Sequence, residues 1–233
     1  MASLLHVGTA TTRGGLTTYE DYALDELEAA GHTIGAYKQY SDAEVTSGYD
    51  AVVVHARGAH GLGTKYRNCG MPTVGFGRDD LFKGSGTWNH ATTIDLPVGN
   101  NSYYEDNTTI TWTGQTVDTA VNINANGTQM QVTSGLDADA VTVCKHTDTS
   151  SGASLWAFEA GDVVDGVTLT AKMVGLGINT TYWQAGVANA AGEQLLLDIV
   201  DWLVDSGAPA TRLLDRRRPR RAGRIAQVRA AHY

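Results

Sequence analysis

The chain has 233 residues, of which 42% are hydrophobic and 18% are charged, and its formal net charge is −8 at pH 7. This composition excludes an intrinsically disordered protein and allows a sizeable hydrophobic core, which suits one α/β domain or one large β domain. Its two cysteines exclude a disulfide framework, and neither has neighbours at zinc-ligand spacing, so we expect no metal site. We also expect no cofactor.

The first third of the chain alternates strand and helix signals. A helix is predicted after Thr17 or Thr18, because apolar residues from Tyr19 to Ala30 recur at helical spacing and Gly31 follows. A second, short helix is predicted over 41–48. Apolar runs predict strands at 3–8, 32–38, 49–56 and 72–77. This β-α-β-α-β order indicates a parallel sheet with right-handed crossovers.

The middle of the chain has a different pattern. From about residue 88 to residue 166, short alternating segments are separated by Asn, Gly and Asp turns, which predicts antiparallel hairpins on or beside the parallel core. A core strand is predicted at 167–178. The apolar face of Leu195, Leu196, Ile199, Trp202 and Leu203 predicts a closing helix within 189–207.

Two quoted stretches carry a resemblance to a known family: "YDAVVVHA…GLGTKYRNCGMPTVGFG" and "KMVGLGI…GEQLLLDIVDWLV". The chain resembles, over residues 2–206, the flavodoxin-like domains related to class I glutamine amidotransferases, specifically their non-catalytic modules in bacterial surface and multidomain proteins. The resemblance implies a flavodoxin-like α/β fold, with a parallel sheet flanked by helices. The expected organisation is one domain over 1–207, a β-rich insertion over 88–166 and a basic arm over 208–233.

The active enzymes of that superfamily place a cysteine nucleophile on a strand-to-helix turn and take a histidine from a later loop. Here the turn after the fourth strand reads "GFGRDDLFK" and contains no cysteine, while Cys69 precedes that strand. The later loop "INTTYWQAG" contains no histidine. The resemblance therefore implies neither amidotransferase nor peptidase activity, and we expect no enzyme.

Loops after the third and fourth strands form a possible ligand site, because such loops converge at the carboxyl edge of a doubly wound sheet. Acids, bases and cations there could support hydrolysis or bind a small anion. Alternatively, Arg78 pairs with a neighbouring aspartate and each histidine is a packed or surface residue. The glycine-rich stretch 58–65 departs from a phosphate-binding loop, since Lys65 is displaced by one position. The possible site comprises His55, Arg57, His60, Arg78, Asp79 and Asp80.

The C-terminal stretch has the opposite charge from the rest of the chain. Residues 211–233 carry eight arginines and one acid, a formal +7, which leaves −15 on residues 1–210. Arginine side chains need carboxylate, phosphate or water partners, and Pro219 and Gly223 oppose a continuous helix. This segment is the predicted partner-binding arm. Its arginines are Arg212, Arg216, Arg217, Arg218, Arg220, Arg221, Arg224 and Arg229.

Three functions fit an acidic body with a basic arm. The first is a non-enzymatic structural subunit docked by the arm onto neighbouring subunits of a larger homo- or hetero-oligomeric assembly, with a virion capsid-decoration or tail protein as the favoured case. The second is a nucleic-acid-associated protein that binds phosphates through the arm. The third is a divergent hydrolase that uses the loops after strands three and four. We expect no membrane association and no signal peptide, and synthesis in a host cytoplasm.

Overall fold

A computed structural model of the chain describes residues 1–56, 65–77, 92–95, 101–104, 120–122, 131–134, 137–146, 153–177 and 188–205. The predicted C-terminal arm lies outside these residues, and so does the glycine-rich stretch except Lys65. Within the described residues, no helix has both the length and the apolar character needed to cross a membrane.

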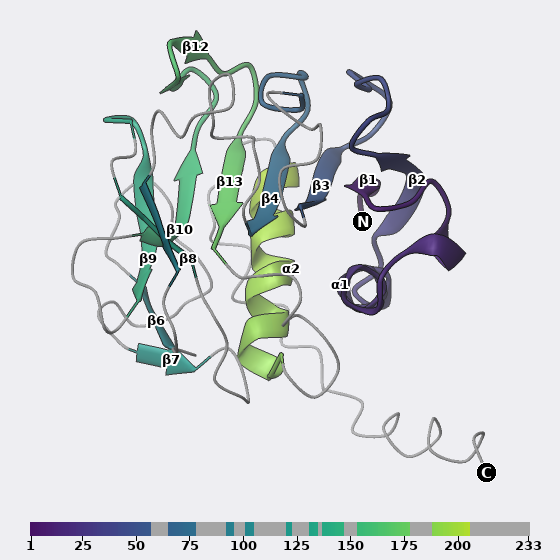
Figure 1. Cartoon of the computed structure of the whole chain (residues 1–233), viewed down its shortest axis with the longest axis horizontal. Helices are drawn as coiled ribbons and strands as arrows, with labels where there is room; N and C mark the ends of the chain where they lie inside the picture. Colours follow the sequence, from purple (N-terminus) through teal and green to yellow (C-terminus); the bar gives the residue numbers. More distant parts are fainter. Residues whose placement is uncertain are drawn as a thin grey trace.

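In the described part of the chain, five parallel strands form one end of the main sheet, which continues beyond β13 (Figure 1). Their order is β2-β1-β3-β4-β13, and each neighbouring pair is parallel. This is the strand order of flavodoxin-like folds, so the predicted α/β class is confirmed. The strands are β1 (Ser3–Gly8), β2 (Thr33–Gln39), β3 (Ala51–Ala56), β4 (Thr73–Gly77) and β13 (Met173–Leu176).

The two long helices of the described residues begin at local sequence signals. Helix α1 (Thr18–Ala29) begins at a capping box formed by Thr17 and Glu20, and the chain leaves it through Gly31, whose φ is +97°. Helix α2 (Ala190–Val204) begins at Asn189, whose side-chain oxygen accepts hydrogen bonds from the backbone of Ala191 and Gly192. Both helices were predicted from the sequence, and both are confirmed.

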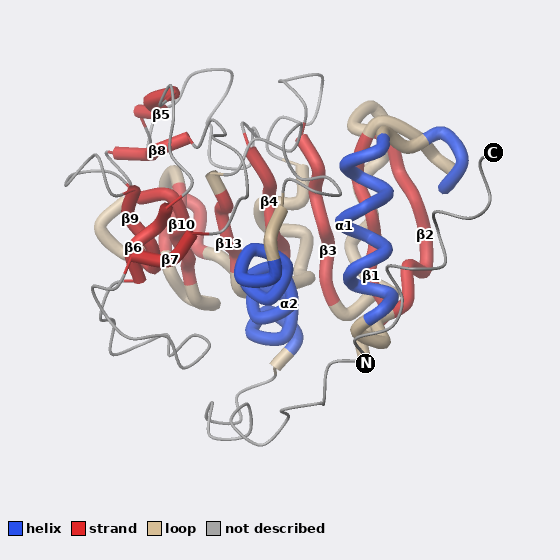
Figure 2. Tube along the Cα trace, turned by 90° about the horizontal axis from the view of Figure 1, so that it is seen from below, coloured by secondary structure: helices blue, strands red, loops and turns tan. Residues whose placement is uncertain are grey.

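Both helices cover the same face of the sheet (Figure 2). Alternate strand residues point to this face, and Leu4, Val53 and Val174 pack there against Leu24 of α1 and Leu196 of α2. The opposite face of the described sheet is covered by irregular segments that contribute Tyr40, Tyr66, Met71 and Leu169. The inner strands β1, β3, β4 and β13 therefore have a core on each side, which fits their largely apolar sequences, whereas the edge strand β2 has no buried residue.

Antiparallel strands extend the sheet beyond β13. Strand β10 pairs with β13 and β9, β9 pairs with β6, and β6 pairs with β7, all antiparallel. The prediction of antiparallel strands between residues 88 and 166 is confirmed. One of the short alternating segments in this region, "NTTITWTG" at 107–114, lies outside the described residues. The bounds are β5 (Thr92–Asp95), β6 (Asn101–Tyr104), β7 (Ala120–Asn122), β8 (Gln131–Ser134), β9 (Val141–His146) and β10 (Ala153–Phe158).

The strand predicted at 167–178 is two strands. Val167–Thr168 is β12, which pairs with β11 (Val163–Val164) in a separate hairpin. Asp165 and Gly166 both have positive φ, 55° and 71°, as a tight hairpin turn requires. The chain folds back here, so the strand that enters the main sheet starts only at Met173.

The short helix predicted at 41–48 is absent, and a turn, bends and irregular backbone occupy these positions. The polar groups of this segment form hydrogen bonds with residues outside it. Lys65 Nζ donates to the carbonyls of Tyr40 (2.9 Å) and Asp42 (3.0 Å), and the Glu44 carboxylate accepts from the backbone of Tyr66 (2.8 Å). These tertiary hydrogen bonds outweigh the weak local helix preference.

Candidate functional site

The candidate site lies where β1 and β3 run side by side. From β1 the chain crosses to β2 on one side, and from β3 it passes to β4 on the other. This is the topological switch point, at which open α/β sheets bind ligands outside the carboxyl ends of their strands. His6 of β1 and His55 of β3 both lie in this region.

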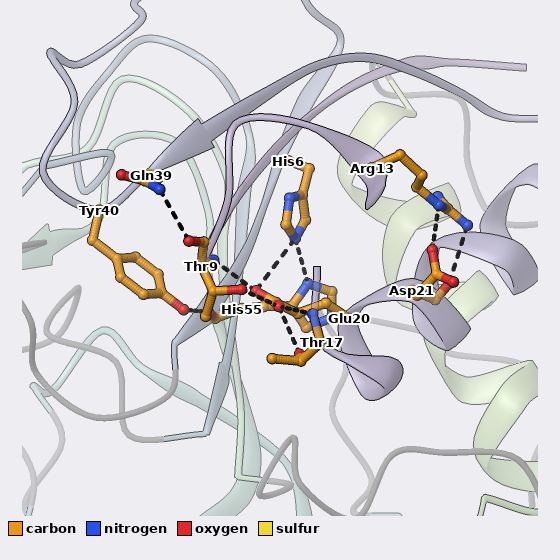
Figure 3. A network of polar contacts seen from close by, with 9 residues as sticks. All are labelled: His6, Thr9, Arg13, Thr17, Glu20, Asp21, Gln39, Tyr40 and His55. Carbon is orange, nitrogen blue, oxygen red and sulfur yellow. Dashed lines mark hydrogen bonds and ion pairs between the residues drawn. The ribbon is translucent and has the colours of Figure 1, made fainter. Parts of the chain in front are cut away.

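Glu20 reaches the site from the first turn of α1 (Figure 3). Its carboxylate accepts four hydrogen bonds. Two come from the backbone N–H groups of Thr9 and Thr17, each at 2.8 Å. Two come from the hydroxyls of the same residues, at 2.5 and 2.6 Å. The carboxylate thus joins the loop after β1 to the start of the helix.

The two histidine rings contact each other in the core. His6 Nε2 and His55 Nδ1 are 3.2 Å apart in a buried hydrogen bond, and Glu20 Oε1 lies 4.0 Å from the same His6 nitrogen. The His55 ring stacks on Phe76 of β4, with centroids 4.6 Å apart. The Tyr40 hydroxyl donates to the backbone carbonyl of His55. His6, Glu20 and His55 are each at most 1% exposed.

Burial decides the charge of the imidazoles. Desolvation lowers the pKa of His55 to about 4, although the Glu20 carboxylate acts in the opposite direction. Desolvation also lowers the pKa of His6, and the neighbouring His55 and Arg13 lower it further. Burial opposes ionisation of Glu20, but its hydrogen bonds from Thr17 and Thr9 lower its pKa overall. At neutral pH the site holds one carboxylate and two neutral imidazoles.

Gly8 permits this close arrangement. A Cβ at this position would lie inside van der Waals contact of Glu20 Oε1, and 2.5 Å from His6 Cε1. Any side chain here would displace the carboxylate or the ring. The absence of a Cβ at residue 8 is therefore part of what brings the helix carboxylate to the strand histidine.

The structure places few of the predicted site residues. Of the possible ligand site, His55 is described, whereas Arg57, His60, Arg78, Asp79 and Asp80 lie outside the described residues. His55 is buried and held by His6, and its low pKa leaves it poorly suited as a general base at neutral pH. The eight arginines of the arm are also outside the described part of the chain.

Sequence reasoning missed His6 and Glu20. One signal was readable, because Thr17 and Glu20 have the spacing of a capping box. The contact between the histidines had no local signal, since residues 6 and 55 meet only when β1 and β3 are neighbours. Among the described residues, no group of three or more His, Cys, Asp or Glu side chains could hold a metal ion.

Both cysteines are buried thiols. Burial raises the pKa of Cys69, and this outweighs its contacts with the Met71 carbonyl and the Thr73 hydroxyl. A nucleophilic cysteine requires the opposite environment, which stabilises the thiolate. Cys69 is therefore a packing residue of the second core, the apolar cluster on the sheet face opposite the two helices.

The chain matches no family model, and no curated protein matches it. Among solved structures, it is similar to a cold-adapted β-galactosidase from Rahnella sp. R3, with a TM-score of 0.49 and 11% identity over 86% of this chain. The chain spans 30% of the length of that protein. It is also similar to a ThuA-like protein from Parabacteroides merdae, with a TM-score of 0.45 and 12% identity over 89% of this chain and 91% of that one.

Proposed function

We propose that this chain is a non-enzymatic structural subunit that docks onto a larger assembly through its arginine-rich C-terminal segment. The observation that carries the proposal is the separation of charge along the sequence, with +7 on residues 211–233 and −15 on residues 1–210. Such asymmetry is typical of a partner-binding tail. The favoured assembly is a virion, in which the chain would be a capsid-decoration or tail protein.

The chemistry of arginine supports a docking role. Guanidinium groups form bidentate, charge-assisted hydrogen bonds with carboxylates and phosphates, and they are costly to bury without such partners. Eight of them within 23 residues, next to one acid, cannot be satisfied within the segment itself. The segment therefore requires an anionic partner surface or water.

The charge of the domain favours a protein partner over nucleic acid. A body with a formal charge of −15 repels the phosphates that the arm would attract, so binding to a duplex would be weak and salt-sensitive. A patch of carboxylates on a neighbouring protein subunit would repel the acidic domain only at short range, because salt screens more distant charges. We accordingly place the partner among protein subunits.

The proposal also assigns the chain to the non-catalytic relatives of class I glutamine amidotransferases. The environment of Cys69 supports this assignment, because its thiol is buried and its pKa is raised. The His55 imidazole is engaged with His6 and stacked on Phe76. Both groups therefore have structural contacts that account for their presence without a reaction.

Deletion of residues 212–233 tests the docking role. We expect the truncated chain to keep its circular dichroism spectrum and its thermal unfolding temperature, but to be lost from the purified native assembly. A matched pair of full-length variants separates charge from length: all eight arginines changed to glutamine should abolish incorporation, whereas all eight changed to lysine should retain part of it. Incorporation of the truncated chain at the level of the full chain would rule out the docking role.

A further inference from the structure

The histidine pair has a fixed inventory of protons. Its inner nitrogens, His6 Nε2 and His55 Nδ1, face each other at 3.2 Å and share one proton. Its outer nitrogens, His6 Nδ1 and His55 Nε2, are buried without a hydrogen-bond partner in the described part of the chain. Two neutral imidazoles carry two protons, so one lies between the rings and the other lies on an outer nitrogen.

Each added proton has a different structural cost. The first goes to the remaining outer nitrogen, where it creates a buried cation with an unpaired N–H group. The Glu20 carboxylate, 4.0 Å from His6, offsets part of this charge. The second must go to an inner nitrogen, so that two N–H donors face each other across 3.2 Å. The hydrogen bond then cannot exist, and the rings must separate.

We propose that His6, His55 and Glu20 form an acid-labile latch, which ties β1, β3 and the first turn of α1 together at neutral pH and opens when the two imidazoles are protonated. This latch concerns the α/β domain and is independent of the role proposed for the C-terminal segment. Its opening would uncover the switch point between β1 and β3.

The groups packed around His6 and His55 do not stabilise two protonated imidazoles, so protonation favours opening of the latch. Arg13, from the loop after β1, opposes protonation of His6. Tyr37 of β2 lies beside the His6 ring, with centroids 5.7 Å apart, and Phe76 of β4 stacks on the His55 ring. Glu20 of α1 supplies the negative charge, and its oxygens already accept four hydrogen bonds. The described neighbours thus provide one partial counter-charge for two protons.

The direction of the pH dependence follows from the lowered imidazole pKa values. In the open state both rings titrate near 6.5, whereas in the closed state the pKa of His55 is about 4 and that of His6 is also lowered. The latch therefore stabilises the fold fully above pH 6.5 and loses this contribution as the pH falls toward 4. Glu20, whose pKa is lowered from 4.5, acts in the same direction at lower pH.

Hydrogen exchange on the full-length chain tests the latch. Between roughly pH 7 and pH 5, after correction for the intrinsic exchange rate, we expect protection in residues 3–8, 18–29 and 51–56 to fall about tenfold or more. Residues 173–176 and 190–204 should keep their protection. Equal loss in all segments, or no loss in the first set, would overturn the proposal.

Variants test whether the histidines are the groups that take up the protons. The number of protons taken up on opening is given by the pH dependence of the opening free energy, as measured by hydrogen exchange. Between roughly pH 6 and pH 5 this number should be about two for the native chain. For His55→Phe, whose ring can still stack on Phe76, it should be about one. His32→Gln is the matched control, because His32 lies elsewhere, 3.7 Å from Asp201, and should leave the count unchanged. An unchanged count in His55→Phe would contradict the latch.

A measurement on the native chain does not depend on whether a variant folds. In ¹⁵N NMR spectra of the histidine rings, His6 and His55 should keep the chemical shifts of neutral imidazoles down to pH 6 and below. Titration of either ring with a pKa near 6.5 would overturn the proposal.

Discussion

Replacement of Glu20 by alanine should destabilise the protein by about 3–5 kcal/mol, because it removes a buried carboxylate and leaves its four partly buried donors without their acceptor. The backbone N–H groups and hydroxyls of Thr9 and Thr17 all donate to this carboxylate. The substitution also removes the capping box at the start of α1. Urea unfolding at pH 7, followed by tryptophan fluorescence and circular dichroism, measures the loss.

Two further variants separate the buried carboxylate from a general effect of charge on α1. Glu20→Gln keeps one acceptor oxygen and the shape of the side chain, so its cost should lie between that of alanine and zero. Glu28→Ala is the matched control, because Glu28 lies on the same helix and its side chain is 44% exposed beside Arg13. It should change stability by less than about 0.5 kcal/mol. Equal effects of Glu20→Ala and Glu28→Ala would show that the carboxylate network contributes nothing.

Gly175→Ala should cost about 3 kcal/mol, because residue 175 of β13 lies directly opposite Trp156 of β10. A Cβ at this position would lie inside van der Waals contact of three atoms of the indole ring. Trp156 is 2% exposed and belongs to the second core, so its ring cannot move away without disturbing its neighbours. Overpacking of a close-packed interior of this kind is destabilising.

The matched control for this glycine is Gly14→Ala. No atom lies within 4 Å of a Cβ at Gly14, so alanine should be neutral or slightly stabilising there. The same urea titration measures both variants, and the fluorescence of Gly175→Ala should also report displacement of Trp156. A Gly175→Ala protein as stable as Gly14→Ala would show that the indole does not occupy the space above Gly175.

The sequence predicted those elements whose signals are local. Helix α1 has a cap at Thr17, apolar spacing from Tyr19 to Leu27 and a stop at Gly31, and all three agree with its bounds. The helix predicted at 41–48 failed because Lys65 and Tyr66 bind that segment. These partners lie about twenty residues away, beyond the reach of any local pattern.

The candidate site was predicted only in part, because only one of its three residues has a local sequence signal that identified it. His55 was identified because it ends a buried apolar strand at the carboxyl edge of the sheet. His6 and Glu20 join it through pairing of β1 with β3 and through the packing of α1 on the sheet. Both contacts depend on strand order, which a single sequence does not encode locally.

The most direct test of the docking role identifies what the C-terminal segment touches. A photoreactive amino acid at Ala222, between Arg221 and Arg224, would be irradiated in the native assembly, and the products identified by mass spectrometry. The proposed function predicts cross-links to another protein subunit, at a surface rich in aspartate and glutamate. Cross-links to nucleic acid, or only to residues 1–207 of the same chain, would contradict it.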